Sequence, residues 1–111
     1  MGKFYNLKVW GEEYKIKLNR STYCYNNSLA IICYTDEQEE FAILTTCINE
    51  KPNNNCAFVD TNNCPWAEKF LQENNIATPT GRAGESGFCF YPEYKFNIDE
   101  IEELKEEEEG E

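Results

Sequence analysis

The sequence predicts an α+β domain in which one helix packs on an antiparallel sheet of about five to six strands. Three observations support this fold class: short runs of alternating or β-branched apolar residues, turn-rich segments between these runs, and one stripe of apolar residues with helical spacing. A chain of 111 residues has room for one such domain.

The first two strands are predicted as a hairpin. Residues 4–9 and 14–19 each alternate apolar and polar side chains, and residues 10–13 lie between them as the turn. One face of this hairpin would be apolar. The opposite face would carry three lysines, Lys8, Lys15 and Lys17.

The middle of the chain predicts a second hairpin, formed by residues 29–34 and 41–48 across an acidic turn. Their short length and β-branched residues favour strands over helices. Residues 56–60 predict a short strand, and residues 88–96 predict the last one, in which Pro92 indicates an edge or a bulge.

The helix is predicted over residues 64–75. Asn62 and Asn63 can cap it, Pro65 suits its first turn, and one stripe of apolar residues would face the sheet: Trp66, Ala67, Phe70 and Leu71.

Residues 78–87 contain three glycines and a proline, which predict an irregular loop with positive-φ positions. Asn97 and Glu100 then form a possible capping box for a short C-terminal helix. The apolar stripe of that helix would be Ile98, Ile101 and Leu104.

The formal charge of −11 is unevenly distributed along the chain. Residues 1–20 carry five basic and two acidic groups, whereas residues 99–111 carry nine acidic groups and one lysine. We therefore expect a single α+β domain over residues 1–98 and an acidic, helical-to-disordered tail over residues 99–111. This charge predicts a protein partner, for which a basic surface would be complementary, whereas duplex DNA would be repelled.

The composition excludes several kinds of chemistry. The chain contains no histidine, which rules out Ser-His-Asp and Cys-His catalysis and histidine-containing zinc sites. The six cysteines lack CxxC spacing, so a zinc knuckle is not predicted. Cys64 is the one candidate for a low-pKa thiol, with an inert residue at the helix cap as the alternative. We expect no enzyme activity, no cofactor and no metal.

The N-terminus does not resemble a signal peptide, and no run reaches the roughly 20 apolar residues that span a bilayer. We therefore expect a cytoplasmic protein with reduced cysteines and no membrane contact. The oligomeric state is left open by the sequence.

The lysine face of the first hairpin supports an alternative function. Lys8, Lys15 and Lys17, with Trp10 and Arg20 nearby, could form a platform for single-stranded nucleic acid. An ordinary solvated sheet face explains the same pattern, because exposed lysines also discourage edge-to-edge pairing.

Three segments carry a family resemblance: DTNNCPWAEKF, then PTGR, then SGFCFYPEYKF. With these, residues 3–98 resemble the DUF4313 family, short bacterial proteins of unknown function found in phages and conjugative elements. The acidic tail lies outside the resemblance. Such a setting implies an inhibitor of host defence nucleases, of the anti-CRISPR or anti-restriction type.

The sequence therefore predicts a small acidic binding protein rather than an enzyme. The candidate binding residues come from the exposed parts of the family-like segment: Asn62, Asn63, Trp66, Arg82 and Tyr91. Structural roles would explain the same residues, with the asparagines as helix caps, the aromatic residues in the core and Arg82 as a loop anchor.

Overall fold

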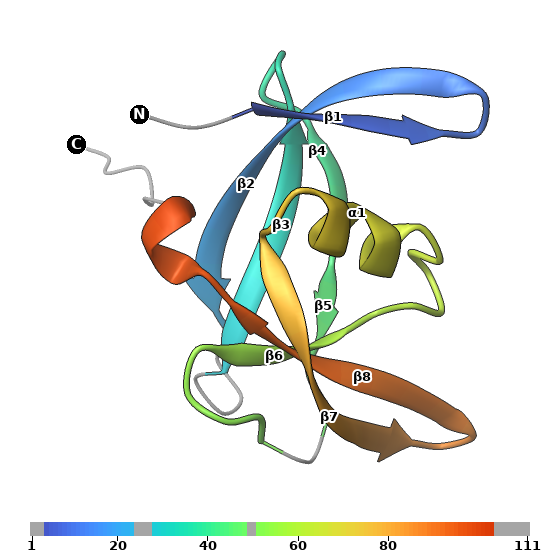
Figure 1. The fold of residues 1–111 in the computed structure, drawn as a ribbon, viewed down its shortest axis with the longest axis vertical. Helices are drawn as coiled ribbons and strands as arrows, with labels where there is room; N and C mark the ends of the chain where they lie inside the picture. The colour runs from blue at the N-terminus through green and yellow to red at the C-terminus, as the bar shows by residue number, and fades with distance from the viewer. Residues whose placement is uncertain (1–3, 24–27, 49–50, 104–111) are drawn as a thin grey trace.

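The computed structural model describes residues 4–23, 28–48 and 51–103. Within these residues, nine strands, one α-helix and one 3-10 helix form the fold (Figure 1). In chain order they are β1 (Phe4–Val9), β2 (Glu12–Thr22), β3 (Leu29–Thr35), β4 (Glu40–Ile43), β5 (Thr45–Thr46), β6 (Cys56–Val59), α1 (Ala67–Glu73), β7 (Ala77–Ser86), β8 (Cys89–Phe96), η1 (Ile98–Glu100) and β9 (Glu102–Glu103).

The described strands form two sheets, so the α+β class is confirmed but the single sheet of five to six strands is wrong. One sheet has the order β1-β2-β3-β4, with β9 added beside β2, and the other has the order β5-β6-β8-β7. The chain changes sheet inside the run that predicted one strand over residues 41–48. At that point the backbone N–H of Leu44 donates to the carbonyl of Ile31, and Thr45 then pairs with Val59.

The first hairpin is confirmed, and its turn is tighter than predicted. Val9 pairs with Glu12, so only Trp10 and Gly11 connect the strands. Both have positive φ, 53° and 76°, as a two-residue turn that matches the twist of the strands requires. Tyr5, Leu7 and Val9 are buried, in agreement with the predicted apolar face.

The helix begins later than predicted, at Ala67. Neither asparagine caps it, because Trp66 occupies the N-cap position and makes no side-chain cap. Residues 60–66 form turns instead, and the Asp60 carboxylate accepts hydrogen bonds from both the backbone and the side chain of Asn63. The apolar stripe is confirmed, since Ala67, Phe70 and Leu71 are buried.

The loop predicted for residues 78–87 is wrong, because this segment forms β7 and pairs with β8. The register of this pairing shifts between Pro79 and Ala83, and the positive-φ residue Gly81 lies at the shift. Gly84 does not have positive φ and is buried. A Cβ atom there would lie 2.5 Å from Ile48 and 2.8 Å from Phe58, so this glycine is required by packing.

The prediction for Pro92 agrees with the pairing. It lies in the part of β8 that pairs only with β7, because β6 pairs only with residues 93–95 of β8. Its missing N–H therefore removes no hydrogen bond to β6.

The expected C-terminal α-helix is replaced by η1 and β9. Asn97 makes no side-chain cap, so the predicted capping box is not formed. The chain turns at η1 and then runs parallel to β2, where Asn19 pairs with Glu102, and Ile101 is buried in the core. Residues 104–111 of the expected tail, including Leu104, lie outside the described residues.

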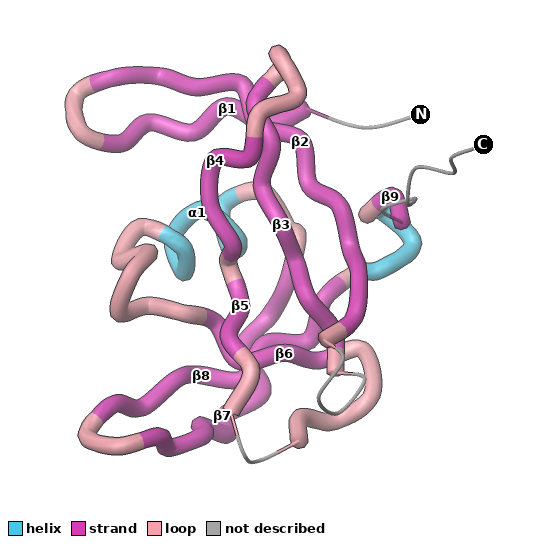
Figure 2. Tube along the Cα trace, turned by 180° about the vertical axis from the view of Figure 1, so that it is seen from behind, coloured by secondary structure: helices cyan, strands magenta, loops and turns pink. Residues whose placement is uncertain are grey.

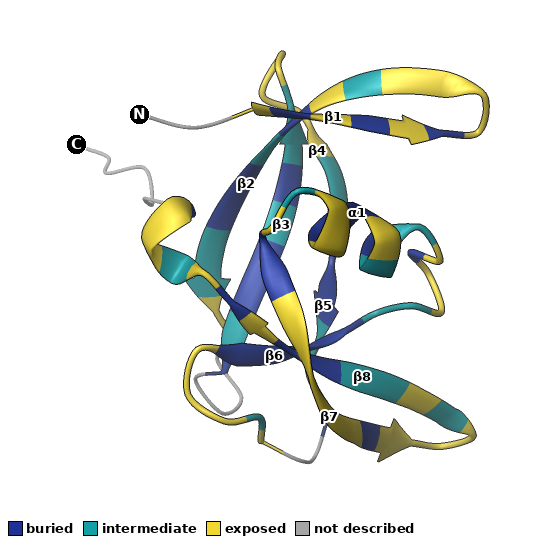
Figure 3. Ribbon diagram, viewed as in Figure 1, coloured by how far each residue is buried: buried dark blue, intermediate teal, exposed yellow. Residues whose placement is uncertain are grey.

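The core lies between the two sheets and α1 (Figure 3). The Tyr94 hydroxyl links β8 to α1, because it accepts a hydrogen bond from the Gln72 side chain and donates one to the Glu68 carboxylate. Among the described residues, no helix has the length and apolar composition to cross a membrane. The main core side chains are Tyr5, Leu7, Ile16, Ile31, Leu44, Val59, Phe70, Leu71, Ile76, Tyr94, Phe96 and Ile101.

The β1–β2 and β7–β8 hairpins project to the same side of the molecule, with α1 between them (Figures 1 and 2). Their turns, residues 10–11 and residues 87–88, are therefore presented on one flank.

Candidate protein-binding groove

A groove of about 470 Å³ is lined in part by Trp10, in the turn of the β1–β2 hairpin. Its walls come from the β1–β2 turn, from β4 and β5, and from the turns over residues 60–66. The residues that line it are Trp10, Tyr23, Glu40, Phe41, Ala42, Ile43, Thr45, Thr46, Cys47, Asp60, Asn63, Cys64 and Trp66.

A row of aromatic rings connects this groove to the core. Phe41 is central, with its ring centroid 6.0 Å from that of Trp10 and 6.1 Å from that of Trp66. Trp66 in turn contacts Phe70 edge-on at 6.1 Å, and Phe70 meets Tyr5 at 6.0 Å. The row begins in the buried core and ends at Trp10, which is 71% exposed.

The charged side chains lining the groove are all acidic. Among the described residues, Glu40 and Asp60 are the only carboxylates that line it, and no described lysine or arginine does. Asp60 is already fixed by Asn63, at 2.8 and 3.2 Å. Within the described part of the chain, neither carboxylate forms an ion pair, so both remain able to accept bonds from a cation.

The tip of the β7–β8 hairpin is apolar and exposed. Phe88 is fully exposed and Phe90 is 66% exposed, beside the positive-φ residue Gly87. Exposed aromatic residues grouped at one place typically mark an interaction surface. Phe88 and Phe90 are not among the residues predicted from sequence, because FCFY indicates a strand; the preceding Ser-Gly is the signal that places them beside a turn.

Several of the predicted binding residues lie near the groove. Asn63 and Trp66 line it, and Asn62 is exposed in the turn beside them. Tyr91 is half-buried on β8; its pKa is raised by a hydrogen bond with Cys89, by burial and by the nearby charge of Asp60. The structure adds Trp10, Phe41 and the two carboxylates, and the indole N–H of Trp66 is buried without an acceptor among the described residues.

Arg82 has a structural role away from the groove. Its guanidinium lies 3.0 Å from the carboxylate of Glu93, which is wholly buried. That carboxylate also accepts bonds from the Thr80 hydroxyl at 2.6 Å and from the Asn53 backbone N–H at 2.9 Å. Burial raises the pKa of Glu93, but these bonds and the arginine outweigh burial and hold the pKa below its ordinary value.

The hypothesis of an activated Cys64 thiol is not supported by its surroundings. Cys64 lies before α1 rather than in its first turn, and its thiol donates to the carbonyl of Ile43 at 3.7 Å. Burial, aided by the charge of Asp60, raises the pKa of Cys64 to about 11. The thiol is therefore protonated at neutral pH, and the alternative of an inert residue accounts for it.

Four of the described cysteines, Cys33, Cys56, Cys64 and Cys89, are free thiols. Cys24 lies outside the described residues. Over the described ranges, no three cysteine, aspartate or glutamate side chains gather as metal ligands would.

The lysine face is partly occupied by the C-terminal segment. Lys17 forms an ion pair of 3.1 Å with Glu102, and the Arg20 guanidinium donates to the carbonyl of Ile101 at 2.9 Å. Lys8 and Lys15 remain exposed on the same hairpin.

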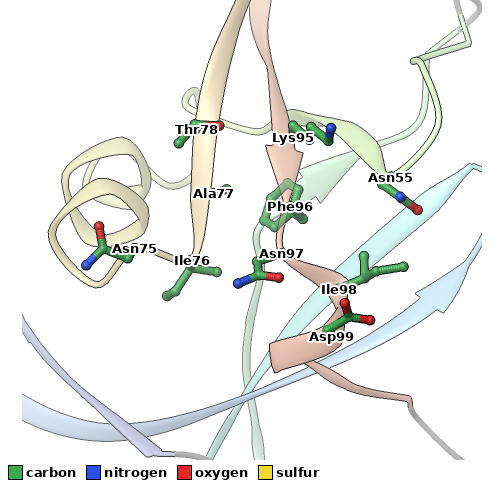
Figure 4. Close-up of a pocket in the computed structure, with 10 residues that line it drawn as sticks. All are labelled: Asn55, Asn75, Ile76, Ala77, Thr78, Lys95, Phe96, Asn97, Ile98 and Asp99. Carbon is green, nitrogen blue, oxygen red and sulfur yellow. The ribbon is translucent and has the colours of Figure 1, made fainter.

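A second pocket, of about 390 Å³, lies where β7 and β8 meet η1 (Figure 4). Its lining is largely amide and apolar, and its only charged side chains, Lys95 and Asp99, lie at opposite ends of the view. Two backbone hydrogen bonds connect its lining residues, from the Asn97 N–H to the Ile76 carbonyl and from the Phe96 N–H to the Asn55 carbonyl.

Comparison with known proteins identifies the family. The model of a family described as "Domain of unknown function (DUF4313)" matches residues 17–110. The chain belongs to this family. The DUF4313 match begins inside β2 and includes the acidic C-terminal residues, so the expectation that the resemblance spans residues 3–98 and excludes the tail is wrong. No curated protein and no solved structure proved similar to the chain.

Proposed function

We propose that this DUF4313 member is a protein-binding module that needs neither a cofactor nor chemistry of its own. The observation that carries the proposal is the placement of three exposed aromatic side chains, Trp10, Phe88 and Phe90, at two hairpin tips that project to one side. Aromatic residues dominate the energetics of protein interfaces because they bury a large area with few rotatable bonds.

The partner proposed here is a basic protein. The net charge of −11 would accelerate its encounter, and the groove beside Trp10 adds two carboxylates and, among the described residues, no lysine or arginine. In a phage or conjugative element, a host defence nuclease is a partner of this kind, since its surface carries cations for phosphate. The protein would then act as an anti-CRISPR or anti-restriction inhibitor.

Site-specific photo-crosslinking in a bacterial host tests the module. A photoreactive phenylalanine analogue at Phe88 is expected to capture one protein. The same analogue at Phe4, which is exposed on β1 away from both hairpin turns, should not capture it. The captured protein is then purified, and its affinity for the Phe88→Ser/Phe90→Ser variant is measured. Equal capture at both positions, or unchanged affinity of the variant, would contradict the proposal.

The electrostatic part of the proposal has its own test. Deleting residues 104–111 removes five glutamates and one lysine while leaving the buried Ile101 in place. We expect the truncated chain to associate more slowly with the captured partner, and the difference to shrink as salt is raised. If neither deletion nor salt alters the association rate, a basic partner is wrong.

Single-stranded nucleic acid remains a second candidate because one observation favours it. Phe4, Tyr34 and Lys17 line a pocket of about 400 Å³ on the lysine face, which combines aromatic rings with a cation. Fluorescence anisotropy with labelled single-stranded DNA and RNA at low salt tests it. No binding at concentrations of the order of tens of micromolar would dismiss this candidate.

A further inference from the structure

We infer that the groove recognises an arginine side chain presented by an extended segment of the protein partner. The inference rests on the proposed function and specifies the chemistry of its site. Three features of the groove support it: its charge, the arrangement of its rings and its position along a sheet edge.

The charge of the groove selects a cation. Glu40 stands on β4, and Asp60 stands at the start of the turns that lead to α1. Asn63 holds the Asp60 carboxylate in place but carries no charge, so the negative charges of both groups remain uncompensated by any described side chain in the lining. An anionic or neutral occupant would leave these charges facing it without a counter-ion.

The rings select a planar cation. The ring centroids of Trp10 and Phe41 lie 6.0 Å apart with their planes tilted by 39°, and those of Phe41 and Trp66 lie 6.1 Å apart with a tilt of 55°. Such rings offer faces on which a guanidinium stacks, while its N–H groups reach a carboxylate. A lysine ammonium gains the charge interaction but lacks the planar stack and the forked geometry.

The position of the groove favours a polypeptide. β4 lines the groove and is the last strand of its sheet, so it presents backbone groups that no described strand pairs. β5 offers less, because the Thr45 carbonyl already accepts a hydrogen bond from the Tyr23 hydroxyl. An extended segment can add to such an edge through main-chain hydrogen bonds. The unpaired indole N–H of Trp66 would gain an acceptor if its side chain turned toward a carbonyl of the bound segment.

The test uses the full chain and a capped peptide, Arg-Gly-Arg-Gly-Arg, followed by NMR chemical shifts and isothermal titration calorimetry at an ionic strength of about 0.1 M. Two matched peptides replace every arginine with citrulline or with lysine. We expect saturable binding of the arginine peptide, with the largest shifts at Trp10, Phe41 and Asp60. The lysine peptide should bind at least about threefold more weakly, and the citrulline peptide should not bind.

Variants separate the groove from net charge. Trp10→Ala and the double variant Glu40→Gln/Asp60→Asn should each weaken arginine-peptide binding by about fivefold. Asp99→Asn/Glu103→Gln removes the same charge outside the groove lining and should alter affinity by less than about twofold. All variants change side chains at least partly exposed to solvent, and far-UV circular dichroism checks that each is folded.

Two outcomes overturn the arginine site. One is that the citrulline peptide binds as tightly as the arginine peptide. The other is that Asp99→Asn/Glu103→Gln lowers the affinity for the arginine peptide as much as Glu40→Gln/Asp60→Asn does. If either occurs while crosslinking at Phe88 still captures a partner sensitive to Phe88→Ser/Phe90→Ser, the module stands and only the arginine site fails. If crosslinking at Phe88 and Phe4 captures the same proteins, the proposed function itself fails, whatever the peptide does.

Discussion

The two hairpins on the proposed binding flank project alike but are held by different interactions. β1–β2 keeps a regular register from Phe4 to Lys17, and its inner face packs apolar side chains against the core. β7–β8 loses its register between Pro79 and Ala83, and a wholly buried carboxylate, Glu93, lies near this irregularity.

The comparison shows two ways of fixing a hairpin in space. In β1–β2, alternation and a two-residue turn are local features, and each is visible in the sequence. In β7–β8, the bulge is held by partners that come from elsewhere: Asn53 from the loop before β6, and Ile48 and Phe58 against Gly84. Disrupting these contacts should therefore affect the second hairpin more than a turn substitution affects the first.

The largest effect is expected for Arg82→Ala. The Glu93 carboxylate would stay buried without its cation, at a cost of about 3 kcal/mol in the free energy of unfolding. Urea denaturation measures this cost. Lys69→Ala is the control, because its ion pair with Glu73 is exposed and 3.9 Å long, so it should cost about 0.5 kcal/mol or less. Equal costs would show that the buried pair does not hold this hairpin.

A pH dependence follows from the same carboxylate. The folded pKa of Glu93 lies below its ordinary value of 4.5, so its stabilising contribution is present above pH 4.5 and is lost as the pH falls through the folded pKa. We compare wild type with Glu93→Gln by urea unfolding at about pH 6.5 and about pH 3.5. The difference in unfolding free energy should narrow at the lower pH. A constant difference would mean that the ionised form is not what stabilises the bulge.

A smaller effect is expected for Gly84→Ala. The added methyl group would overlap Ile48 and Phe58, and relieving that overlap should cost about 1–3 kcal/mol. Thermal unfolding compares this variant with Ala83→Ser, an exposed change at the neighbouring position. If both variants unfold at the wild-type temperature, the close packing at Gly84 is wrong.

The smallest effect is expected for Gly11→Ala at the turn of the first hairpin. Space is not the constraint, since nothing lies within 4 Å of a Cβ there, but φ of +76° is unfavourable for alanine by about 1 kcal/mol. Gly11→Asn should recover part of this loss because asparagine adopts positive φ more readily. If Gly11→Ala lowers the free energy of unfolding more than Gly84→Ala does, the first hairpin depends more on its turn than the second depends on its packing contacts, which would contradict the expectation.

The sequence predicted the fold best where the signal was local. The alternation in residues 4–9 and 14–19 placed the first hairpin and its buried face, and the apolar stripe placed α1. It failed at Leu44, where the chain leaves one sheet for the other, because a continuous apolar run gives no sign of a change of partner. The prediction also failed for residues 78–87, where the glycines suggest a loop. In the structure, Gly81 lies at the irregularity in the strand pairing and Gly84 packs closely against Ile48 and Phe58.

The candidate site was predictable only in part. Asn63 and Trp66 were chosen from sequence and line the groove, but Phe41 and Glu40 come from a distant strand that no local pattern connects with them. Arg82 was chosen as a possible binding residue with a loop anchor as the alternative, and the structure pairs it with Glu93. This partner could not be named from sequence, because it is brought close only by the pairing of β7 with β8.

By itself, the sequence determined the α+β class, the first hairpin, the face of the helix and the absence of histidine chemistry, because these depend on neighbouring residues and on composition. Only the tertiary structure decided that the described strands form two sheets, that two hairpins present their aromatic tips on one flank, and that the described residues lining the groove beside Trp10 include carboxylates but no lysine or arginine. These features arise from contacts between residues far apart in the chain, which propensity and periodicity do not encode.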